Sequence, residues 1–259
     1  CRRVPFALLK KVKMELINNT VLITGGSSGI GLELALQLVR KGNKVLICGR
    51  SADRLEKAKN LEPALNIFAC DISTIEGRTS LVNWVKQNHS DCNVLVNNAA
   101  IVHNTSFYED ESMVEKAALE ISTNLLAPIA LSKMFLLIIE QHSRSTIINI
   151  TTGLAFTPRV NYPIYNATKA GLHSFSQVLR EQLKRNDIGV AEVMMTVVDT
   201  PWHNGHPPKI AISPTEAVTE MIKKLEKGQK EIKIGKVKLL YLLSRLAPAF
   251  AFRKINGLK

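Results

Sequence analysis

The sequence TGGSSGIG, from Thr24 to Gly31, follows the apolar run TVLIT at residues 20–24 and decides how the rest of the chain is interpreted. Three of its glycines have the spacing Gly-x-x-x-Gly-x-Gly: Gly25, Gly29 and Gly31. Such a turn leaves a strand and enters a helix whose free N–H groups and positive dipole end attract an anion. Two hydroxyl groups add further donors, those of Ser27 and Ser28. A glycine turn without a ligand is the alternative, but the strand–turn–helix setting favours a phosphate-binding loop.

Apolar, β-branched runs alternate with amphipathic helical patterns along the chain. The expected strands are residues 20–24, 45–48, 67–70, 94–97, 146–150, 190–195 and 232–234. The expected helices are about 29–41, 51–61, 76–89, 111–142, 164–186 and 214–227. Strands that are apolar on both faces and separated by helices predict an α/β fold, a doubly wound, Rossmann-type parallel sheet of about seven strands. Ligands of such a sheet bind at the carboxyl ends of its strands.

Length and composition fit one large α/β domain. The 259 residues are 46% hydrophobic, and no internal repeat or linker-like stretch divides them. We expect no stretch that is apolar over the length of a membrane span. The four cysteines show no Cys-x-x-Cys spacing, so we expect a reducing compartment and no metal site.

The net charge of +12 is concentrated at the two ends of the chain. Residues 1–16 carry +4 and residues 223–259 carry +9, which leaves −1 for residues 17–222. A nucleic-acid-binding protein would carry its basic side chains as a patch on the folded core, with aromatic residues to stack on bases. We therefore expect no nucleic-acid partner.

Three segments follow from these patterns. Residues 1–13 show no convincing signal-peptide cleavage site, and we interpret them as an extension outside the fold that need not be native. Residues 14–235 form the α/β domain. Residues 236–259 have leucines at helical spacing among basic residues and predict a basic amphipathic C-terminal helix. This helix either packs on the sheet or on a partner subunit, or lies on an anionic membrane surface.

The second expected strand ends in ICGRS, residues 47–51. An acidic residue about twenty positions beyond the glycine loop would bind the ribose 2′-hydroxyl of NAD, whereas an arginine accommodates the 2′-phosphate of NADP. The chain has Arg50 there and no acid, which favours NADP over NAD. A solvated arginine at the start of a helix is the alternative.

Polar side chains also follow the third and fourth strands. Asp71, in CDIS, either caps the next helix or accepts a hydrogen bond from an adenine amino group. The amides and small residues of NNAA, residues 97–100, suit a loop pressed against a nucleotide, although a plain turn has the same composition.

The fifth strand ends with Thr151 and Thr152, and the next helix contains YNATK, in which Tyr165 and Lys169 are four residues apart. Residues i and i+4 lie on one face of a helix, so the phenol and the ammonium point into one space. Alone, the pair indicates a tyrosine stacked on a lysine stem at a helix surface. Beside a nucleotide site, a hydroxyl, a phenol and an ammonium predict acid–base chemistry.

In this order, the motifs TGGSSGIG, CDIS, NNAA, STN and YNATK resemble the short-chain dehydrogenases/reductases of the Tyr-x-x-x-Lys type, over about residues 21–200. The run GLAFTP and the ending IGKVKLLYLLSRLAP resemble the bacterial DltE-type subgroup. The resemblance implies that residues 14–235 bind NAD(P) and transfer hydride between the nicotinamide and a small-molecule carbonyl or secondary alcohol. It implies cofactor contacts at Gly25, Ser27, Ser28, Gly29, Ile30, Gly31, Arg50, Asp71, Ile72, Asn98, Ala99, Tyr165, Lys169 and Thr200.

The resemblance also implies four catalytic residues. Tyr165 would be the general acid in reduction and the base in oxidation, although a free phenol has a pKa of about 10. The Lys169 ammonium would favour the phenolate and hold the nicotinamide ribose. The Thr152 hydroxyl would polarise the substrate oxygen, and Asn124 would hold a water that links Lys169 to solvent.

Three positions depart from the family pattern. The usual serine is Thr152, whose methyl group takes up substrate volume, and Ala100 replaces a loop glycine. The family's Pro-Gly-x-x-x-Thr reads MTVVDT at residues 195–200, so Thr200 remains while the Pro-Gly turn is absent. The alternatives are therefore a nucleotide-binding regulatory protein with little or no catalysis, or a membrane-surface scaffold.

The region after Thr200, PWHNGHPPKIAI at residues 201–212, would form a short lid over the substrate. Its histidines, His203 and His206, either contact substrate or stay exposed. The family commonly dimerises or tetramerises, which implies a homodimer or homotetramer through the helices at 111–142 and 164–186. We expect a cytoplasmic protein, peripheral at the membrane if the C-terminal helix binds lipid.

Overall fold

The computed structural model describes residues 15–142, 144–203 and 205–258. The extension expected at residues 1–13 lies outside the described residues.

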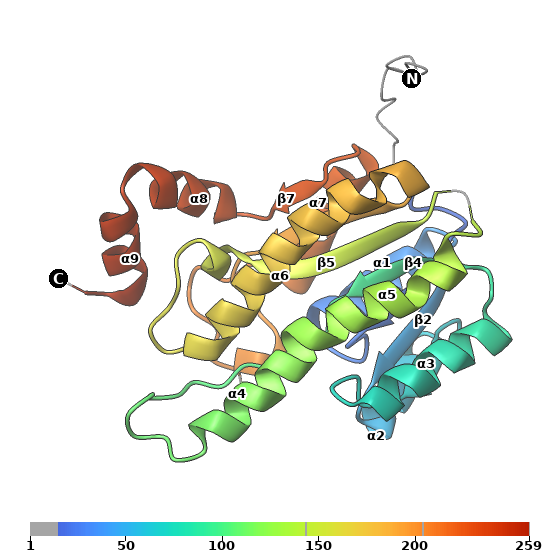
Figure 1. The fold of residues 1–259 in the computed structure, drawn as a ribbon, viewed down its shortest axis with the longest axis horizontal. Helices are drawn as coiled ribbons and strands as arrows, with labels where there is room; N and C mark the ends of the chain where they lie inside the picture. The colour runs from blue at the N-terminus through green and yellow to red at the C-terminus, as the bar shows by residue number, and fades with distance from the viewer. Residues whose placement is uncertain (1–14, 143, 204, 259) are drawn as a thin grey trace, which may run out of the picture.

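The described chain forms one seven-stranded parallel sheet with helices on both faces (Figure 1). The strand order is β3-β2-β1-β4-β5-β6-β7, so the chain reverses direction across the sheet between β1 and β4. The strands are β1 (Thr20–Thr24), β2 (Lys44–Gly49), β3 (Asn66–Ala69), β4 (Cys92–Asn97), β5 (Thr146–Thr152), β6 (Gly189–Met195) and β7 (Glu231–Lys233). The predicted fold class is confirmed. The reversal places a ligand site at the carboxyl ends of β1 and β4.

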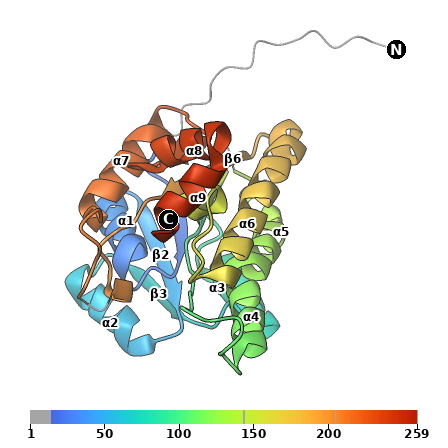
Figure 2. The ribbon, with the colours of Figure 1, turned by 90° about the vertical axis from the view of Figure 1, so that its left-hand side faces the viewer.

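Helices cover the two faces of the sheet in two separate layers (Figure 2). The first layer consists of α1 (Gly29–Arg40), α2 (Ala52–Leu61) and α7 (Pro214–Glu226). The second layer includes α3 (Ile75–Asn88), α5 (Ala127–Ile139) and α6 (Pro163–Gln182). Successive strand residues point to opposite faces, so Val21 and Ile23 pack in the first layer and Leu22 in the second. This explains why the strands are apolar at every position.

The helix expected at residues 111–142 is interrupted by a wider turn. It consists of α4 (Met113–Ile121), a π-helical turn (Ser122–Leu126) and α5. Taken together, these pieces form one helical stretch, Met113–Ile139. An 18-residue window of it has a mean hydropathy of 1.6, so among the described residues this stretch alone is long and apolar enough to cross a membrane. The expectation that no stretch is so apolar was wrong. In the fold, α5 supplies core residues such as Leu131 and Phe135, which are fully buried.

The expectation of a single C-terminal helix at residues 236–259 was also wrong, because the described part of this segment forms two helices. They are α8 (Val237–Leu246) and α9 (Pro248–Asn256), and they meet at Ala247. Pro248 has no N–H and disfavours helical geometry at the residue before it, so α8 ends and Pro248 takes the first position of α9. Figure 1 shows α8 and α9 extending from the end of the body beyond β7.

Candidate active site

The glycine loop after β1 is held against the end of β4. The Thr24 hydroxyl oxygen accepts hydrogen bonds from the N–H groups of Asn98 (3.0 Å) and Ala99 (3.1 Å). The Asn98 side-chain amide donates to the carbonyl groups of Thr24 (2.9 Å) and Gly25 (3.2 Å). Asn98, predicted to contact a cofactor, therefore has its side chain engaged in bracing the loop.

Two of the three predicted glycines have no room for a side chain. Gly25 has φ +65°, and a Cβ there would lie 2.8 Å from the Cα of Ala99. A Cβ on Gly31 would overlap the Gly25 carbonyl and the Asn98 amide. The loop therefore presents bare backbone.

The start of α1 fits an anionic group. Within the described chain, the N–H groups of Ser27, Ser28, Gly29, Ile30 and Gly31 donate no hydrogen bond. The Ser28 side chain, at the N-cap position, does not cap the helix. Free N–H groups at the positive end of a helix dipole suit a phosphate. The residues present therefore fit the pyrophosphate of a dinucleotide.

The end of β2 lies beside this loop. A Cβ on Gly49 would be 3.3 Å from the Ser27 hydroxyl. The next residue, Arg50, is exposed and makes no hydrogen bond or ion pair with any other residue that the structure describes. An arginine in this position is available to an anionic group of a bound ligand.

The end of β3 settles one of the two alternatives for Asp71. The hydroxyl of Thr74, not the carboxylate of Asp71, caps α3, since it accepts a hydrogen bond from the Gly77 N–H at 3.0 Å. Asp71 Oδ1 instead accepts from the Ser73 N–H (2.9 Å), and Ile72 is buried. The cap interpretation was wrong, and a role for Asp71 in binding adenine stays a prediction.

The segment after β6 reaches the glycine loop despite its missing Pro-Gly turn. A Cβ on Gly29 would lie 3.3 Å from the methyl group of Thr200, so these residues are neighbours. The backbone is fixed by hydrogen bonds from Asp199 N–H to the Ile212 carbonyl (2.9 Å) and from Ile212 N–H to the Val197 carbonyl (3.1 Å). Thr200 thus lies beside the start of α1, and its contact with a cofactor stays a prediction.

Tyr165 and Lys169 lie on α6, as predicted, with the Lys169 Nζ 5.9 Å from the centre of the Tyr165 ring. Lys169 is buried, and its Nζ donates a hydrogen bond to the carbonyl of Ile150 on β5 (2.8 Å). Thr152 ends the same strand, and its hydroxyl oxygen accepts from the Leu154 N–H at 3.3 Å. The structure thus ties α6 to the strand that carries Thr152.

Burial disfavours the charged form of both groups. It is the main cause that raises the pKa of Tyr165 above its usual value, and the carboxylate of Glu120 and the phenol of Tyr162 raise it further. Burial lowers the pKa of Lys169 from 10.5 to about 8, and the Glu192 carboxylate partly offsets this change. In the protein alone, the phenol therefore keeps its proton at neutral pH.

Asn124 is fully buried in the π-helical turn and clamps the segment that follows β4. Its Oδ1 accepts from the Ile101 N–H (2.9 Å), and its Nδ2 donates to the Ile101 carbonyl (2.7 Å). A weaker bond joins it to the Thr168 hydroxyl (3.4 Å). The amide therefore pairs with protein groups, and the water-holding role that the family resemblance implies stays a prediction.

Two buried carboxylates near this pair were not predicted. Glu120 on α4 accepts from both the backbone N–H of His103 and its ring Nδ1, each at 2.8 Å, while its Oε2 has no partner among the described residues. Glu192 on β6 contacts the ring Nδ1 of His173 (2.8 Å) and the hydroxyl of Thr151 (2.5 Å). The sequence signal was weak: Glu192 is the one acid in the apolar strand β6, whereas α4 contains Glu115 as well as Glu120 and nothing in the sequence marks which of them is buried.

The predicted lid meets the helix that carries Tyr165. The Trp202 ring lies edge-on to the ring of Tyr162, with centroids 5.5 Å apart, and to that of His203 at 4.6 Å. Tyr162 is the N-cap residue of α6. His206 is exposed. The lid therefore contacts α6 through aromatic rings.

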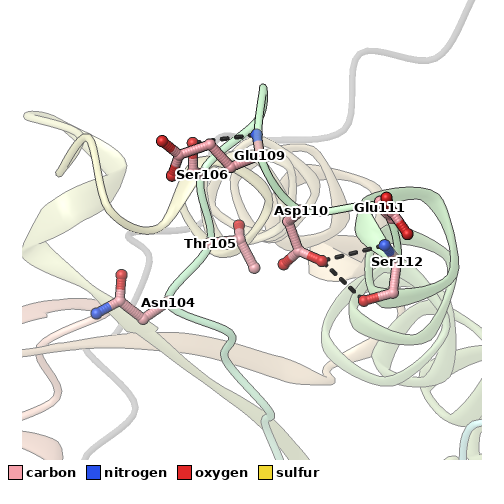
Figure 3. Close-up of a pocket in the computed structure, with 7 residues that line it drawn as sticks. All are labelled: Asn104, Thr105, Ser106, Glu109, Asp110, Glu111 and Ser112. Atoms are coloured by element: carbon pink, nitrogen blue, oxygen red, sulfur yellow. Dashed lines mark hydrogen bonds between the residues drawn. The ribbon is translucent and has the colours of Figure 1, made fainter.

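Two surface hollows lie outside the predicted site. The larger, of about 580 Å³, is formed by the loop before α4, where Asp110 binds both the N–H and the hydroxyl of Ser112 (Figure 3). The second, of about 390 Å³, lies between α6 and α9 and is bordered by Phe252. No group of three His, Cys, Asp or Glu side chains in the described chain is arranged to hold a metal ion.

Comparison with known proteins gives consistent results. The family model described as short chain dehydrogenase matches residues 19–210. "Uncharacterized oxidoreductase DltE" of Bacillus subtilis is 39% identical over 248 residues, 94% of this chain and 98% of that protein. This confirms the expected resemblance to the DltE-type subgroup.

Solved structures show the same fold. A short chain dehydrogenase from Burkholderia cenocepacia in complex with NADP has a TM-score of 0.82 at 21% identity, covering 93% of this chain and 99% of that one. A 3-ketoacyl-(acyl-carrier-protein) reductase from Brucella melitensis complexed with NADH has a TM-score of 0.77 at 22% identity, covering 85% and 97%. At these identities, the likeness extends to the fold alone.

The burial of Lys169 predicts a pH-dependent stability. Folding lowers its pKa from 10.5 to about 8, so the unfolded chain binds this proton more tightly than the folded chain. The folded state is therefore destabilised by the full amount below pH 8, and this destabilisation fades between pH 8 and 10.5. At about 1.4 kcal/mol per pKa unit, the destabilisation by the buried ammonium amounts to roughly 3 kcal/mol. A variant without the lysine would also lose the hydrogen bond to Ile150, which would cancel roughly 1–2 kcal/mol of the gain. Lys169→Met should therefore raise the free energy of unfolding at pH 7 by about 1–2 kcal/mol, measured by urea denaturation.

The gain should shrink as the pH is raised from 8 towards 10.5. Lys57→Met, an exposed position on α2, is the matched control and should show no such trend. A Lys169→Met protein that is no more stable than the wild type at pH 7 would contradict the assignment of Lys169 as a destabilising buried cation.

Proposed function

The chain belongs to the short-chain dehydrogenase family, and from this we propose that it is an NAD(P)-dependent oxidoreductase acting on a small carbonyl compound or secondary alcohol. The observation that carries the proposal is the pairing of Tyr165 and Lys169 on a helix tied to the strand of Thr152. The open N–H groups after β1 support a place for the pyrophosphate in the same sheet edge. A bound nicotinamide would supply the exchange of hydride with the substrate carbon.

Tyr165 is proposed as the group that gives a proton to the substrate oxygen in reduction and takes it back in oxidation. Its raised pKa keeps it protonated in the protein alone, which suits the role of acid. The Lys169 ammonium, close to the ring, stabilises the phenolate that forms when the proton leaves. Glu192 helps to keep that lysine charged.

The two other predicted catalytic residues take more limited roles. Thr152 retains the hydroxyl that would donate a hydrogen bond to the substrate oxygen, because in the structure that oxygen only accepts from Leu154. Asn124 is proposed to act by position. Its amide holds the backbone of Ile101 and contacts the hydroxyl of Thr168, next to Lys169 in the chain.

NADP is proposed as the preferred cofactor. Support comes from Arg50, which follows β2 beside Ser27 and is free to bind a 2′-phosphate. No acidic residue takes the place where the ribose 2′-hydroxyl of NAD would be bound. The remaining predicted contacts, at Asp71, Ile72, Ala99 and Thr200, are proposed to line the same nucleotide.

A homodimer or homotetramer is proposed through α4, α5 and α6. These helices and the π-helical turn between α4 and α5 expose apolar side chains: Val114, Leu119, Ile121, Leu126, Leu137 and Val178. An exposed apolar surface of this kind is typical of a subunit interface. Light scattering of the purified protein measures the mass directly. A cytoplasmic location stays a prediction, and fractionation of cells tests it.

Tyr165→Phe tests the catalytic assignment. Loss of the transferable proton should lower kcat by roughly 10²–10⁴-fold in NADPH-dependent reduction of a panel of carbonyl compounds. NADPH affinity, measured by fluorescence titration, should change by no more than a few-fold. Tyr108→Phe, in which the hydroxyl of an exposed tyrosine is removed, is the matched control and should leave kcat unchanged.

Turnover that persists in Tyr165→Phe refutes the assignment. Tight NADPH binding by the wild type without turnover of any compound in the panel would favour the alternative of a nucleotide-binding regulatory protein.

Arg50→Ala tests the cofactor preference. A charge-assisted bond to a phosphate contributes roughly 1.5–3 kcal/mol, so the Kd for NADPH should rise roughly 10- to 100-fold. The Kd for NADH, which lacks the 2′-phosphate, should change little. Arg40→Ala, at the exposed end of α1, controls for the loss of one positive charge. Equal losses for NADPH and NADH would show that Arg50 does not read the 2′-phosphate.

A further inference from the structure

The C-terminal hairpin, defined here as α8 and α9 (residues 237–256), is attached to the body by its inner face only. Val237 and Ala251 are its only buried residues. The Tyr241 ring packs edge-on against Phe156, with centroids 4.8 Å apart. Asn256 accepts a hydrogen bond from the Val160 N–H (2.8 Å) and donates to the Pro158 carbonyl (3.1 Å). These contacts fix how the hairpin is oriented on the domain.

The outer face of the hairpin is apolar and exposed. Leu239, Leu242 and Leu246 stand at helical spacing and are 57%, 51% and 75% exposed, and Phe250 at the start of α9 is 54% exposed. Residues at i, i+3 and i+7 share one face of a helix. The hairpin therefore packs through its inner face mainly on residues 153–160, which follow β5, while Leu239, Leu242, Leu246 and Phe250 form an exposed apolar stripe.

The charges around this stripe all have one sign. Residues 236–258 contain five basic side chains and no Asp or Glu: Lys236, Lys238, Arg245, Arg253 and Lys254. Lys238 and Arg245 are exposed on α8, beside the leucines. An apolar stripe bordered by cations matches a surface that offers both acyl chains and negative charge.

We infer that the C-terminal hairpin is a docking surface for an anionic lipid bilayer. The leucines and Phe250 enter the boundary between headgroups and acyl chains, while the lysines and arginines contact lipid phosphates. A second copy of the hairpin fits this face less well, because a two-fold contact would place five cations against five others without an acid. The contacts of Tyr241 and Asn256 then hold residues 158–160, which precede α6, close to the membrane.

Cosedimentation with vesicles tests this inference without cofactor or turnover, so it succeeds or fails independently of the proposed enzymatic activity. The full chain should sediment at low salt with vesicles of phosphatidylcholine containing phosphatidylglycerol, and not with phosphatidylcholine alone. Binding should weaken at 0.5 M salt, because about 1 kcal/mol per cation near the surface is screened.

Two sets of variants separate the charge from the apolar contribution. Lys238→Gln with Arg245→Gln should weaken partitioning by roughly 30-fold at low salt, since each cation contributes about fivefold. Leu239→Gln, Leu242→Gln and Leu246→Gln together should abolish it. Glutamine is a good helix former, and circular dichroism checks that the fold is retained.

Matched controls are placed on another helix. Lys57→Gln with Lys59→Gln and, separately, Leu61→Gln remove the same kinds of exposed side chain from α2 and should leave vesicle binding unchanged. Equal losses for the α2 and α8 charge variants would reduce the effect to the net charge of the protein and overturn the inference. Absence of binding to the anionic vesicles at low salt also overturns it. If the protein does not bind vesicles and light scattering shows that it self-associates, and if the leucine variant loses this self-association, the stripe is a subunit contact and the inference is overturned.

Discussion

The site depends on the close contact between the glycine loop that follows β1 and the end of β4. Thr24 receives two backbone N–H groups from that end, and the amide of Asn98 returns two bonds to the turn. The contact leaves no space for a side chain at Gly25 or Gly31. Because the loop bonds to β4 in this way, the N–H groups that follow it stay free at the start of α1. The proposed phosphate site would thus be a consequence of how two strand ends are joined.

The second organising feature is a set of charges held away from water around Tyr165. Lys169 is buried with one carbonyl as its partner, and Glu192 and Glu120 are also buried, each beside a histidine. Burial of such groups opposes folding, and the apolar core must offset it. The domain is therefore less stable than it would be with apolar residues at these positions, but the Lys169 ammonium and the Tyr165 phenol lie close enough for the charge of one to influence ionisation of the other.

Much of the fold could be predicted from the sequence, since each strand is a β-branched apolar run between helical patterns. The break at Pro248 was missed, although a proline disfavours helical geometry at the residue before it. The π-helical turn at Asn124 could not be predicted, because periodicity hardly changes over five residues. The positions of Tyr165 and Lys169 on one helix, and of Thr152 at the end of the strand before it, could be predicted because both are local patterns. The engagement of Asn98 and the cap at Thr74 did not, because a polar residue at a strand end can bind the protein or a ligand equally well.

With the proposed dinucleotide beside Tyr165, a phenol that retains its proton in the protein alone would make proton release and dinucleotide binding interdependent. A positively charged pyridinium next to Tyr165 would promote deprotonation, and by thermodynamic reciprocity deprotonation would strengthen retention of that pyridinium. A dihydropyridine is neutral and carries no such advantage. Alkaline conditions should thus favour the oxidised coenzyme over the reduced one, and acidity should reverse the balance. Burial of one hydroxyl group, assisted by Glu120, would in this way couple the redox state of the bound coenzyme to the acidity of the surroundings.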